Sequence, residues 1–218
     1  MRPAAARPGP IARLALAALL LTALAGCLGS RPAITVEQYS LGYKSPAFPG
    51  LAPLAEGIKV ARFSTTQEIA GTDIVLQSGP YQRQVLDYQR WRVSPADQVT
   101  DFLARDLRAS GLFSLVLTYH DASSVRFKLE GALERFHQVD TPQGPAAVIN
   151  LNLTLLDIRE RELPRRLVFQ REYAMEVPLN QGGAEALAQG LSRAMAQVSA
   201  RVIADLREAA DQRLRQAP

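Results

Sequence analysis

Hydrophobic and polar residues alternate along several segments of this chain, and an alternation with a period of two is typical of a half-buried β-strand. The clearest example is residues 147–158, where every second residue from Ile149 to Leu155 is apolar and the residues from Asn150 to Thr154 between them are polar. Further strands are predicted at residues 39–41, 58–63, 73–77, 84–91, 113–119, 126–136 and 167–177. Turn-forming clusters join several neighbours, so we expect hairpins and a mixed, largely antiparallel sheet.

A first helix is predicted between Ser94 and Gly111. Ser94 suits the N-cap, Pro95 suits the first helical position, and Asp97 adds a carboxylate three residues after the cap. Gly111 is a residue that commonly ends a helix. The apolar face of this helix comprises Val99, Phe102, Leu103 and Leu107.

A long second helix is predicted over residues 184–213, and its apolar stripe is expected to pack on the sheet. The stripe comprises Leu187, Leu191, Met195, Val198, Val202 and Leu206. At 1.5 Å per residue this helix spans about 45 Å, which is more than ordinary strands cover. Two explanations stay open: the turns after Leu206 fray, or they project as a contact for another subunit. Gly190 inside the helix predicts a close approach of its backbone to the sheet.

These elements predict an α/β fold of the α+β kind, in which helices pack on a mixed, largely antiparallel sheet. Residues 38–215 are expected to form one domain, because their number suits a single hydrophobic core and two domains would be cramped.

The N-terminus carries the pattern of a bacterial lipoprotein signal, with residues 1–26 as signal peptide and residues 27–37 as acylated cysteine and tether. Three arginines precede an apolar segment, which ends in Leu24-Ala25-Gly26-Cys27, and Cys27 is the only cysteine of the chain. About 12 apolar residues are too few for a membrane span, which needs about 20. A plain secretory signal or a hydrophobic N-terminal anchor are the alternatives. Leu28-Gly29 resembles the sorting pattern of outer-membrane lipoproteins, if the host is Gram-negative.

Charge argues against a strongly basic or acidic partner surface. Without the three arginines of the leader, 22 basic residues face 21 acidic ones. The mature chain is therefore nearly neutral, which favours neither nucleic acid nor an anionic membrane surface. Beyond Cys27 no cysteine is left for a disulfide.

Motifs for catalysis are missing, and we expect no enzyme activity, no metal and no cofactor. His120 and His137 are the only histidines and do not form a ligand pair. Residues 190–194 lack the second glycine of a nucleophile elbow. His120 and Asp121 are expected to lie in an exposed turn.

Two further features leave alternatives open. The charged turn (residues 159–166) is expected to be a solvated hairpin tip, and the alternative is a contact with lipid headgroups or an acidic partner. Trp91 is expected to be a half-buried strand residue that holds the helix starting at Ser94, and the alternative is an aromatic residue of a binding surface.

The order of these motifs resembles the ABC-type transport auxiliary lipoproteins, the PqiC-like group. The most specific part is an aromatic-x-x-Trp strand end before a proline-capped helix and a Gly-Leu-Phe strand entry. The residues of this chain that match that pattern are Tyr88, Trp91, Pro95, Leu107 and Phe113. The resemblance spans nearly the whole mature chain.

The resemblance implies a periplasmic domain with helices on one side of a mixed sheet, acylated at Cys27 and anchored in the outer membrane. It implies partners in an ABC permease and ATPase and an MCE-type protein, a lipid-transport role, no catalytic residues and a structural role for Trp91. A homo-oligomeric ring is consistent with the family. The chain lacks the tryptophan that often ends the final helix in relatives. A periplasmic lipid carrier, with an apolar pocket between sheet and helices, is the alternative function.

Overall fold

The computed structural model describes residues 9–11 and 34–216. The chain divides into two compact units, residues 1–35 and residues 36–218, and everything below concerns the second. Cys27 and the lipobox lie outside the described residues, so the structure does not test the predicted lipidation site.

The second unit is built on one mixed sheet. Its strands are β1 (Glu37–Tyr39), β2 (Leu54–Val60), β3 (Ser64–Thr65), β4 (Asp73–Gln77), β5 (Arg83–Trp91), β6 (Phe113–Thr118), β7 (Phe127–Thr141), β8 (Gly144–Asp157) and β9 (Leu167–Pro178). The main path runs β1-β5-β4-β7-β2-β6, while β8 pairs with β7 and β9 pairs with β8. The long pairs β7–β8 and β8–β9 are antiparallel, whereas β1–β5, β2–β6, β2–β7 and β4–β7 are parallel. The expected α/β fold with a mixed sheet is confirmed.

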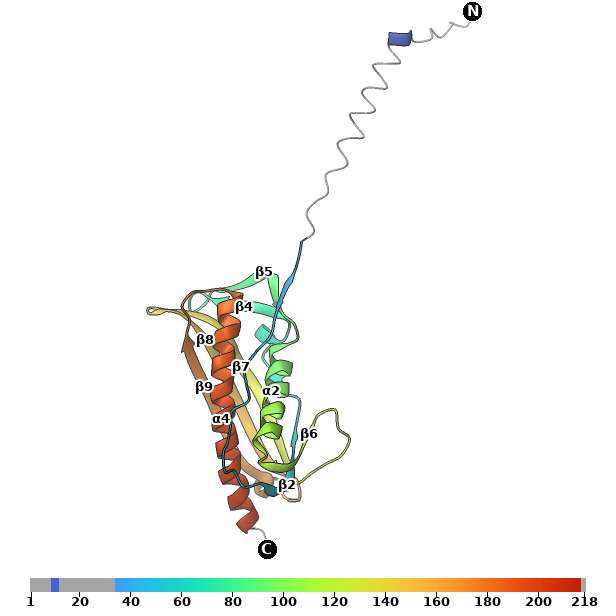
Figure 1. Ribbon diagram of the computed structural model, residues 1–218, viewed down its shortest axis with the longest axis vertical. Helices are drawn as coiled ribbons and strands as arrows, with labels where there is room; N and C mark the ends of the chain where they lie inside the picture. Colours follow the sequence, from blue (N-terminus) through green and yellow to red (C-terminus); the bar gives the residue numbers. More distant parts are fainter. Residues whose placement is uncertain (1–8, 12–33, 217–218) are drawn as a thin grey trace, which may run out of the picture. The chain divides into compact units, whose positions relative to one another are not determined.

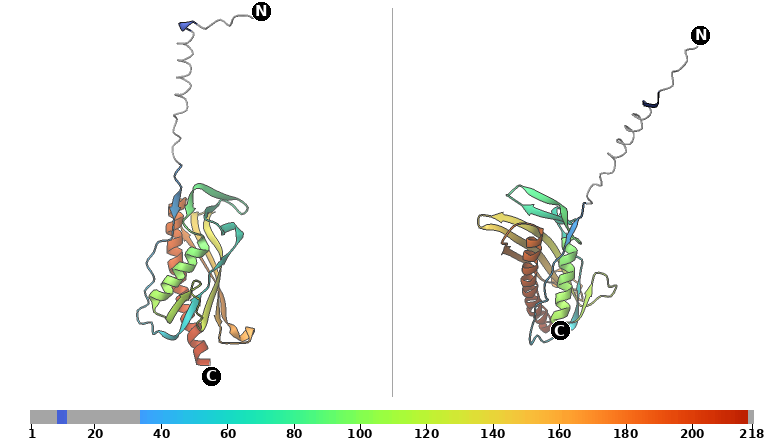
Figure 2. Two further views of the ribbon diagram at one scale, coloured as in Figure 1. Left: turned by 90° about the vertical axis from the view of Figure 1, so that its right-hand side faces the viewer. Right: turned by 45° about the horizontal axis from the view of Figure 1, so that its top comes forward.

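Two helices cover one face of this sheet, α2 (Pro95–Ser110) and α4 (Ala184–Gln216), and they lie side by side (Figures 1 and 2). Two short helical turns, η1 (Gln67–Ile69) and α3 (Leu163–Arg166), lie in connections. The alternation in residues 147–158 explains this arrangement of helices on one face of the sheet. It gives β8 one apolar face, on which the apolar residues from Ile149 to Leu155 are fully buried. The polar residues between them are half-buried on the other face.

Helix α2 begins and ends where its sequence predicts. The Ser94 hydroxyl accepts a hydrogen bond from the Asp97 backbone N–H at 3.2 Å, and Pro95 occupies the first turn. Gly111 ends the helix in the left-handed conformation with a φ of 65°, which glycine adopts without a steric penalty. Leu103 and Leu107 of the predicted apolar face are fully buried.

Helix α4 contradicts both explanations offered for its length. It continues past Leu206 to Gln216, so the last turns do not fray. Nor do these turns leave the domain, because Ala210 is fully buried and Arg213 forms ion pairs with Asp157 and Glu160. The face of α4 that packs on the domain extends beyond Leu206, because Ala210 is buried there and Arg213 continues the same face with its ion pairs.

The segment between β1 and β2 (residues 40–53) is irregular, and it crosses the two helices. The strand predicted at residues 39–41 instead spans Glu37–Tyr39, because the backbone N–H of Leu41 donates to the Gln98 side chain at 2.9 Å. The N–H of Gly42 donates to the Ser192 hydroxyl at 2.9 Å, also outside any sheet. Side chains of both helices thus satisfy backbone groups that a strand would satisfy by pairing.

Gly190 lies where the backbone of α4 comes closest to the sheet, as its sequence context predicts. A Cβ placed there would meet the Leu179 side chain and would lie 2.8 Å from the Cβ of Ala147. Real Cβ atoms do not approach so closely, so a larger residue requires the helix to shift.

We therefore expect Gly190→Ala to destabilise the domain by about 1 to 2 kcal/mol, although alanine is the better helix former by about 1 kcal/mol. Thermal unfolding followed by circular dichroism measures the change. Ala204→Gly, at an exposed position of the same helix, is the control for helix propensity alone. An unchanged or raised melting temperature for Gly190→Ala would show that the close packing has no energetic consequence.

Candidate functional site

The sheet gives the domain two distinct ends. The chain enters at β1, which is parallel to β5, while β5 is antiparallel to β4 and β4 is parallel to β7. Strand β1 is therefore antiparallel in direction to β7, and it begins at the end of the sheet where β7 ends. We call this the tether end. The tether end thus holds the β4–β5 hairpin and the end of β7. The distal end holds the start of β7, the end of β8, the charged turn and the end of α4 (Figure 1).

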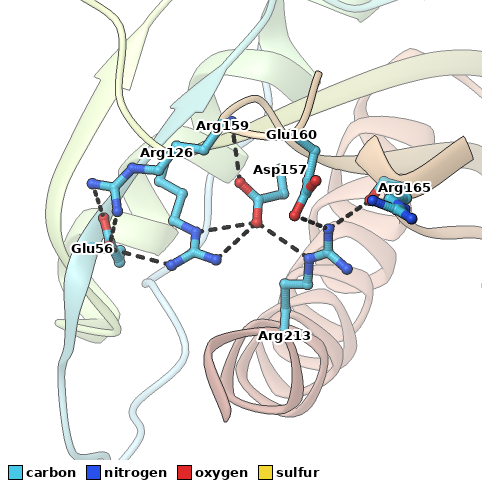
Figure 3. A network of polar contacts seen from close by, with 7 residues as sticks. All are labelled: Glu56, Arg126, Asp157, Arg159, Glu160, Arg165 and Arg213. Atoms are coloured by element: carbon cyan, nitrogen blue, oxygen red, sulfur yellow. Dashed lines mark hydrogen bonds and ion pairs between the residues drawn. The ribbon is translucent and has the colours of Figure 1, made fainter. Parts of the chain in front are cut away.

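A network of charged residues is centred on Asp157 at the distal end (Figure 3). Its side chain is fully buried. The carboxylate Oδ2 accepts hydrogen bonds from Arg126 Nη2 at 2.9 Å and from Arg213 Nε at 3.2 Å. The other oxygen, Oδ1, accepts one from the backbone N–H of Arg159 at 3.2 Å. One buried carboxylate therefore joins β8 to the residue preceding β7, to the charged turn and to α4.

Further ion pairs extend this network outward. Arg159 binds Glu56 of β2 through two hydrogen bonds of 2.9 and 3.1 Å. Arg213 reaches the Glu160 carboxylate at 3.0 Å and donates to the backbone oxygen of Arg165 at 2.6 Å. Arg126 lies 3.5 Å from Glu56. The start of the charged turn is therefore attached to the domain.

The network holds Asp157 in its ionised form. Burial alone raises the pKa of a carboxyl group, but the hydrogen bonds from Arg126 and Arg213 outweigh that effect and lower the pKa of Asp157 below its ordinary value. Conversely, the hydrogen bond to Asp157 raises the pKa of Arg126. The Asp157 carboxylate is thus a buried charge with paired partners, and removing those partners would cost much of the stability of the domain.

The charged turn is only partly the solvated tip that we expected. Arg161 and Glu162 are exposed, as in a solvated tip. Arg159 and Glu160 instead join the network, and Arg166 donates to the backbone oxygen of Glu160 at 3.1 Å. The turn therefore exposes some charged side chains to solvent, while hydrogen bonds to its backbone hold it in place.

Four of the five residues of the family pattern are buried in the fold, and the five do not gather at the distal network. Trp91 is 1% exposed, which corrects the half-buried position expected for it, and its ring meets Phe136 edge-on at 5.2 Å. Pro95, Leu107 and Phe113 are buried. Tyr88 is 52% exposed on β5. The alternative of a binding-surface role for Trp91 is wrong, because solvent does not reach the ring.

The two histidines lie in different environments. His120 and Asp121 lie in an exposed turn, as expected, where the Asp121 carboxylate accepts from the Thr118 backbone N–H at 2.7 Å. His137 is buried on β7 and hydrogen-bonds Gln77 at 3.1 Å. Burial lowers the pKa of His137 to about 4. Among residues 34–216, no group of three or more His, Cys, Asp or Glu side chains could hold a metal ion.

Two pockets of the described residues are surface grooves. One of about 350 Å³ is lined largely by polar residues of the β9–α4 connection and the first turns of α4, among them Gln181 and Gln189. Another of about 210 Å³ lies between β9 and the last turns of α4. Where α4 faces the sheet, the stripe from Leu187 to Leu206 is buried against it. The lipid-carrier alternative, which needs an apolar pocket between sheet and helices, stays a prediction. No helix in the described part of the chain combines the length and hydropathy of a membrane span.

Sequence reasoning missed the network, although two patterns pointed to it. Asp157 stands two residues after Leu155, at the next core-facing position of β8. Arg213 continues the apolar stripe of α4, seven residues after Leu206. A charged residue in an otherwise apolar register predicts a buried ion pair.

Comparisons with known proteins show the fold and the family. A solved structure of a protein from Xanthomonas campestris has a TM-score of 0.74 and 22% identity and covers 83% of this chain and 100% of its own. Another, of a protein described as uncharacterized, has a TM-score of 0.60 and 19% identity and covers 79% and 99%. Identities this low show likeness of fold alone. No match to a curated protein was found. The sequence model of a family described as "ABC-type transport auxiliary lipoprotein component" matches residues 39–203.

Proposed function

The chain belongs to the family of ABC-type transport auxiliary lipoprotein components, and from this premise we propose that it is a non-enzymatic subunit of a lipid transport system. In this proposal Cys27 is acylated, the outer membrane holds the anchor, and the domain faces the periplasm. The distal end docks an MCE-type protein that works with an ABC permease and ATPase.

The separation of the two ends of the domain carries the proposal. Strand β7 has 15 residues and runs from the distal end to the tether end. At about 3.3 Å per residue it spans about 50 Å. An anchor on one end therefore leaves the charged turn free to meet a partner well away from the bilayer. Anchoring also raises the local concentration of that contact, so a modest affinity suffices.

The charge at the distal end favours an acidic partner surface. The network and the charged turn together contain six arginines (Arg126, Arg159, Arg161, Arg165, Arg166 and Arg213) and four acidic residues (Glu56, Asp157, Glu160 and Glu162). The buried part of the network is internally paired. The excess positive charge therefore falls on the exposed turn, where Arg161 has no carboxylate partner among the described residues. Complementary charge at an interface steers association and selects partners.

Reversing a charge on the turn tests this docking. We expect Arg161→Glu to weaken binding of the full-length, acylated protein to its MCE-type partner about tenfold, which corresponds to about 1.4 kcal/mol. Arg201→Glu, at an exposed position of α4, is the matched control because it changes the net charge equally. The measurement is recovery of the MCE-type protein, the permease and the ATPase after crosslinking in membranes, followed by titration of the purified pair.

Two results would contradict the proposal. If the wild-type chain recovers no MCE-type protein or ABC component, the assignment to such a system is wrong. If Arg161→Glu and Arg201→Glu behave alike, another surface makes the contact. Assembly of several copies stays a prediction.

A further inference from the structure

Most of the exposed large apolar side chains of the domain lie on β5 or next to it. Tyr81, at the turn of the β4–β5 hairpin, is 97% exposed. Four other large apolar residues are about half exposed. Val85 and Tyr88 lie on β5, Val93 follows β5, and Val36 precedes β1, which pairs with β5. In the described part of the second unit, the remaining exposed residues of this kind are Leu115 and Leu167, each alone on another strand.

The register of β1 fixes the direction in which this hairpin points. Glu37 pairs with Gln89, and the two strands are parallel. The start of β1 and the start of β5 therefore point in the same direction. The turn of residues 78–82 lies beyond Arg83. The hairpin thus projects at the end of the domain where the chain enters β1.

The lengths of the two segments bring the turn to the bilayer. From Gln89 to Arg83 the strand covers about 20 Å. Ten residues separate Cys27 from Glu37, a length that spans about 35 Å fully extended and about 18 Å as a flexible coil. Unless residues 27–37 are nearly fully extended, they reach no farther from the Glu37–Gln89 pair than the hairpin and its turn do. The turn then reaches the headgroup layer when the anchor is inserted.

The chemistry of the hairpin suits a lipid interface better than a charged protein surface. Tyrosine has an apolar ring and a polar tip, and it is enriched where hydrocarbon meets water. Two arginines of β5 are paired, Arg83 with Glu68 and Arg90 with Asp73 at 2.8 Å. Asp87 and Arg92 of the same segment carry opposite charges. Little unbalanced charge is left to recruit an acidic or basic partner.

We propose that the turn of the β4–β5 hairpin, through Tyr81, is a second membrane contact that seats the domain upright on the bilayer that holds its acyl anchor. The proposal rests on anchoring at Cys27 but not on the identity of any protein partner. The contact is weak by itself and works because the anchor keeps it at high local concentration. Its consequence is that the distal end faces away from the membrane.

A fluorescent label at the turn tests this contact. The thiol of Cys27 is blocked in the acylated protein, so a new cysteine is the single site for a solvent-sensitive dye. Ser78→Cys places the dye on the turn and keeps Tyr81, and Leu167→Cys places it on a half-exposed residue next to the charged turn. Both full-length proteins are reconstituted in phosphatidylcholine vesicles with and without phosphatidylglycerol, together with lipid that carries a shallow spin-label quencher.

We expect at least threefold stronger quenching at residue 78 than at residue 167, with little dependence on phosphatidylglycerol or salt. Adding Tyr81→Ser to Ser78→Cys should reduce the quenching at least twofold, with the circular dichroism spectrum unchanged. Equal quenching at the two sites, or no effect of the serine substitution, would overturn the proposal. Quenching that vanishes as the protein is diluted in the bilayer would overturn it too, because it would identify a second copy as the occupant.

Discussion

Replacing Cys27 with alanine is expected to move the protein from the membrane fraction to the soluble fraction. Each buried methylene of an acyl chain contributes about 0.8 kcal/mol, so several chains hold the protein far more tightly than one chain does. Tyr81 of the β4–β5 hairpin cannot replace that anchor, because its proposed contact depends on the anchor for its local concentration. Membrane sedimentation after cell breakage, with immunodetection, measures the change.

Two further measurements make this test decisive. An uncleaved leader could itself retain Cys27→Ala in the membrane, so a second variant carries a cleavable secretory signal without a cysteine in place of residues 1–27. This variant should be found in the soluble periplasmic fraction. Intact-mass analysis of the mature wild-type protein should show acyl groups on its first residue. A mature chain with a free thiol would refute the anchor assignment.

Asp157→Asn is expected to be the most destabilising of the substitutions considered for the domain. It leaves Arg126 and Arg213 without their buried counter-charge, and breaking a buried pair from one side costs about 3 to 5 kcal/mol. For a domain of this size, about 10 °C of the melting temperature should be lost. Glu130→Gln removes a carboxylate from an exposed pair and should change stability by less than about 0.5 kcal/mol.

Acid should affect the two proteins differently. The pKa of Asp157 is lower in the folded protein than its ordinary value of 3.8, so the unfolded chain takes up this proton first. The stability from this group is complete above that value and is lost as the pH falls through the folded pKa. Wild-type stability should therefore decline more steeply below about pH 4 than that of Asp157→Asn. Parallel curves would mean that Asp157 is not ionised in the fold.

A double-mutant cycle separates this network from a general loss of packing. If Asp157 and Arg213 act together, Asp157→Asn combined with Arg213→Met should cost less than the sum of the single substitutions. Additive costs would show that the two side chains stabilise the domain independently. In that case another contact must keep the last turns of α4 in place.

The sequence determined the elements of this protein by itself, wherever local chemistry and periodicity agree. The alternation over residues 147–158 predicts β8, the cap at Ser94 and Gly111 predicts α2, and the short turn near Gly79 predicts the β4–β5 hairpin. The order of these motifs also predicts the family, which the match over residues 39–203 confirms. Each of these features depends on residues that are close in the chain.

Tertiary structure alone decided where distant charges meet. Glu56, Arg126, Asp157 and Arg213 lie on different segments, and only the sheet topology brings them together at the distal end. Local periodicity predicts the helix over residues 184–213, but it could not decide whether the turns after Leu206 stay packed on the domain. The irregular path of residues 40–53 likewise depends on side chains such as Gln98 and Ser192, which lie far along the chain. Pairing of groups distant in sequence is a property of the folded chain, because its geometry is set only once the layers have packed.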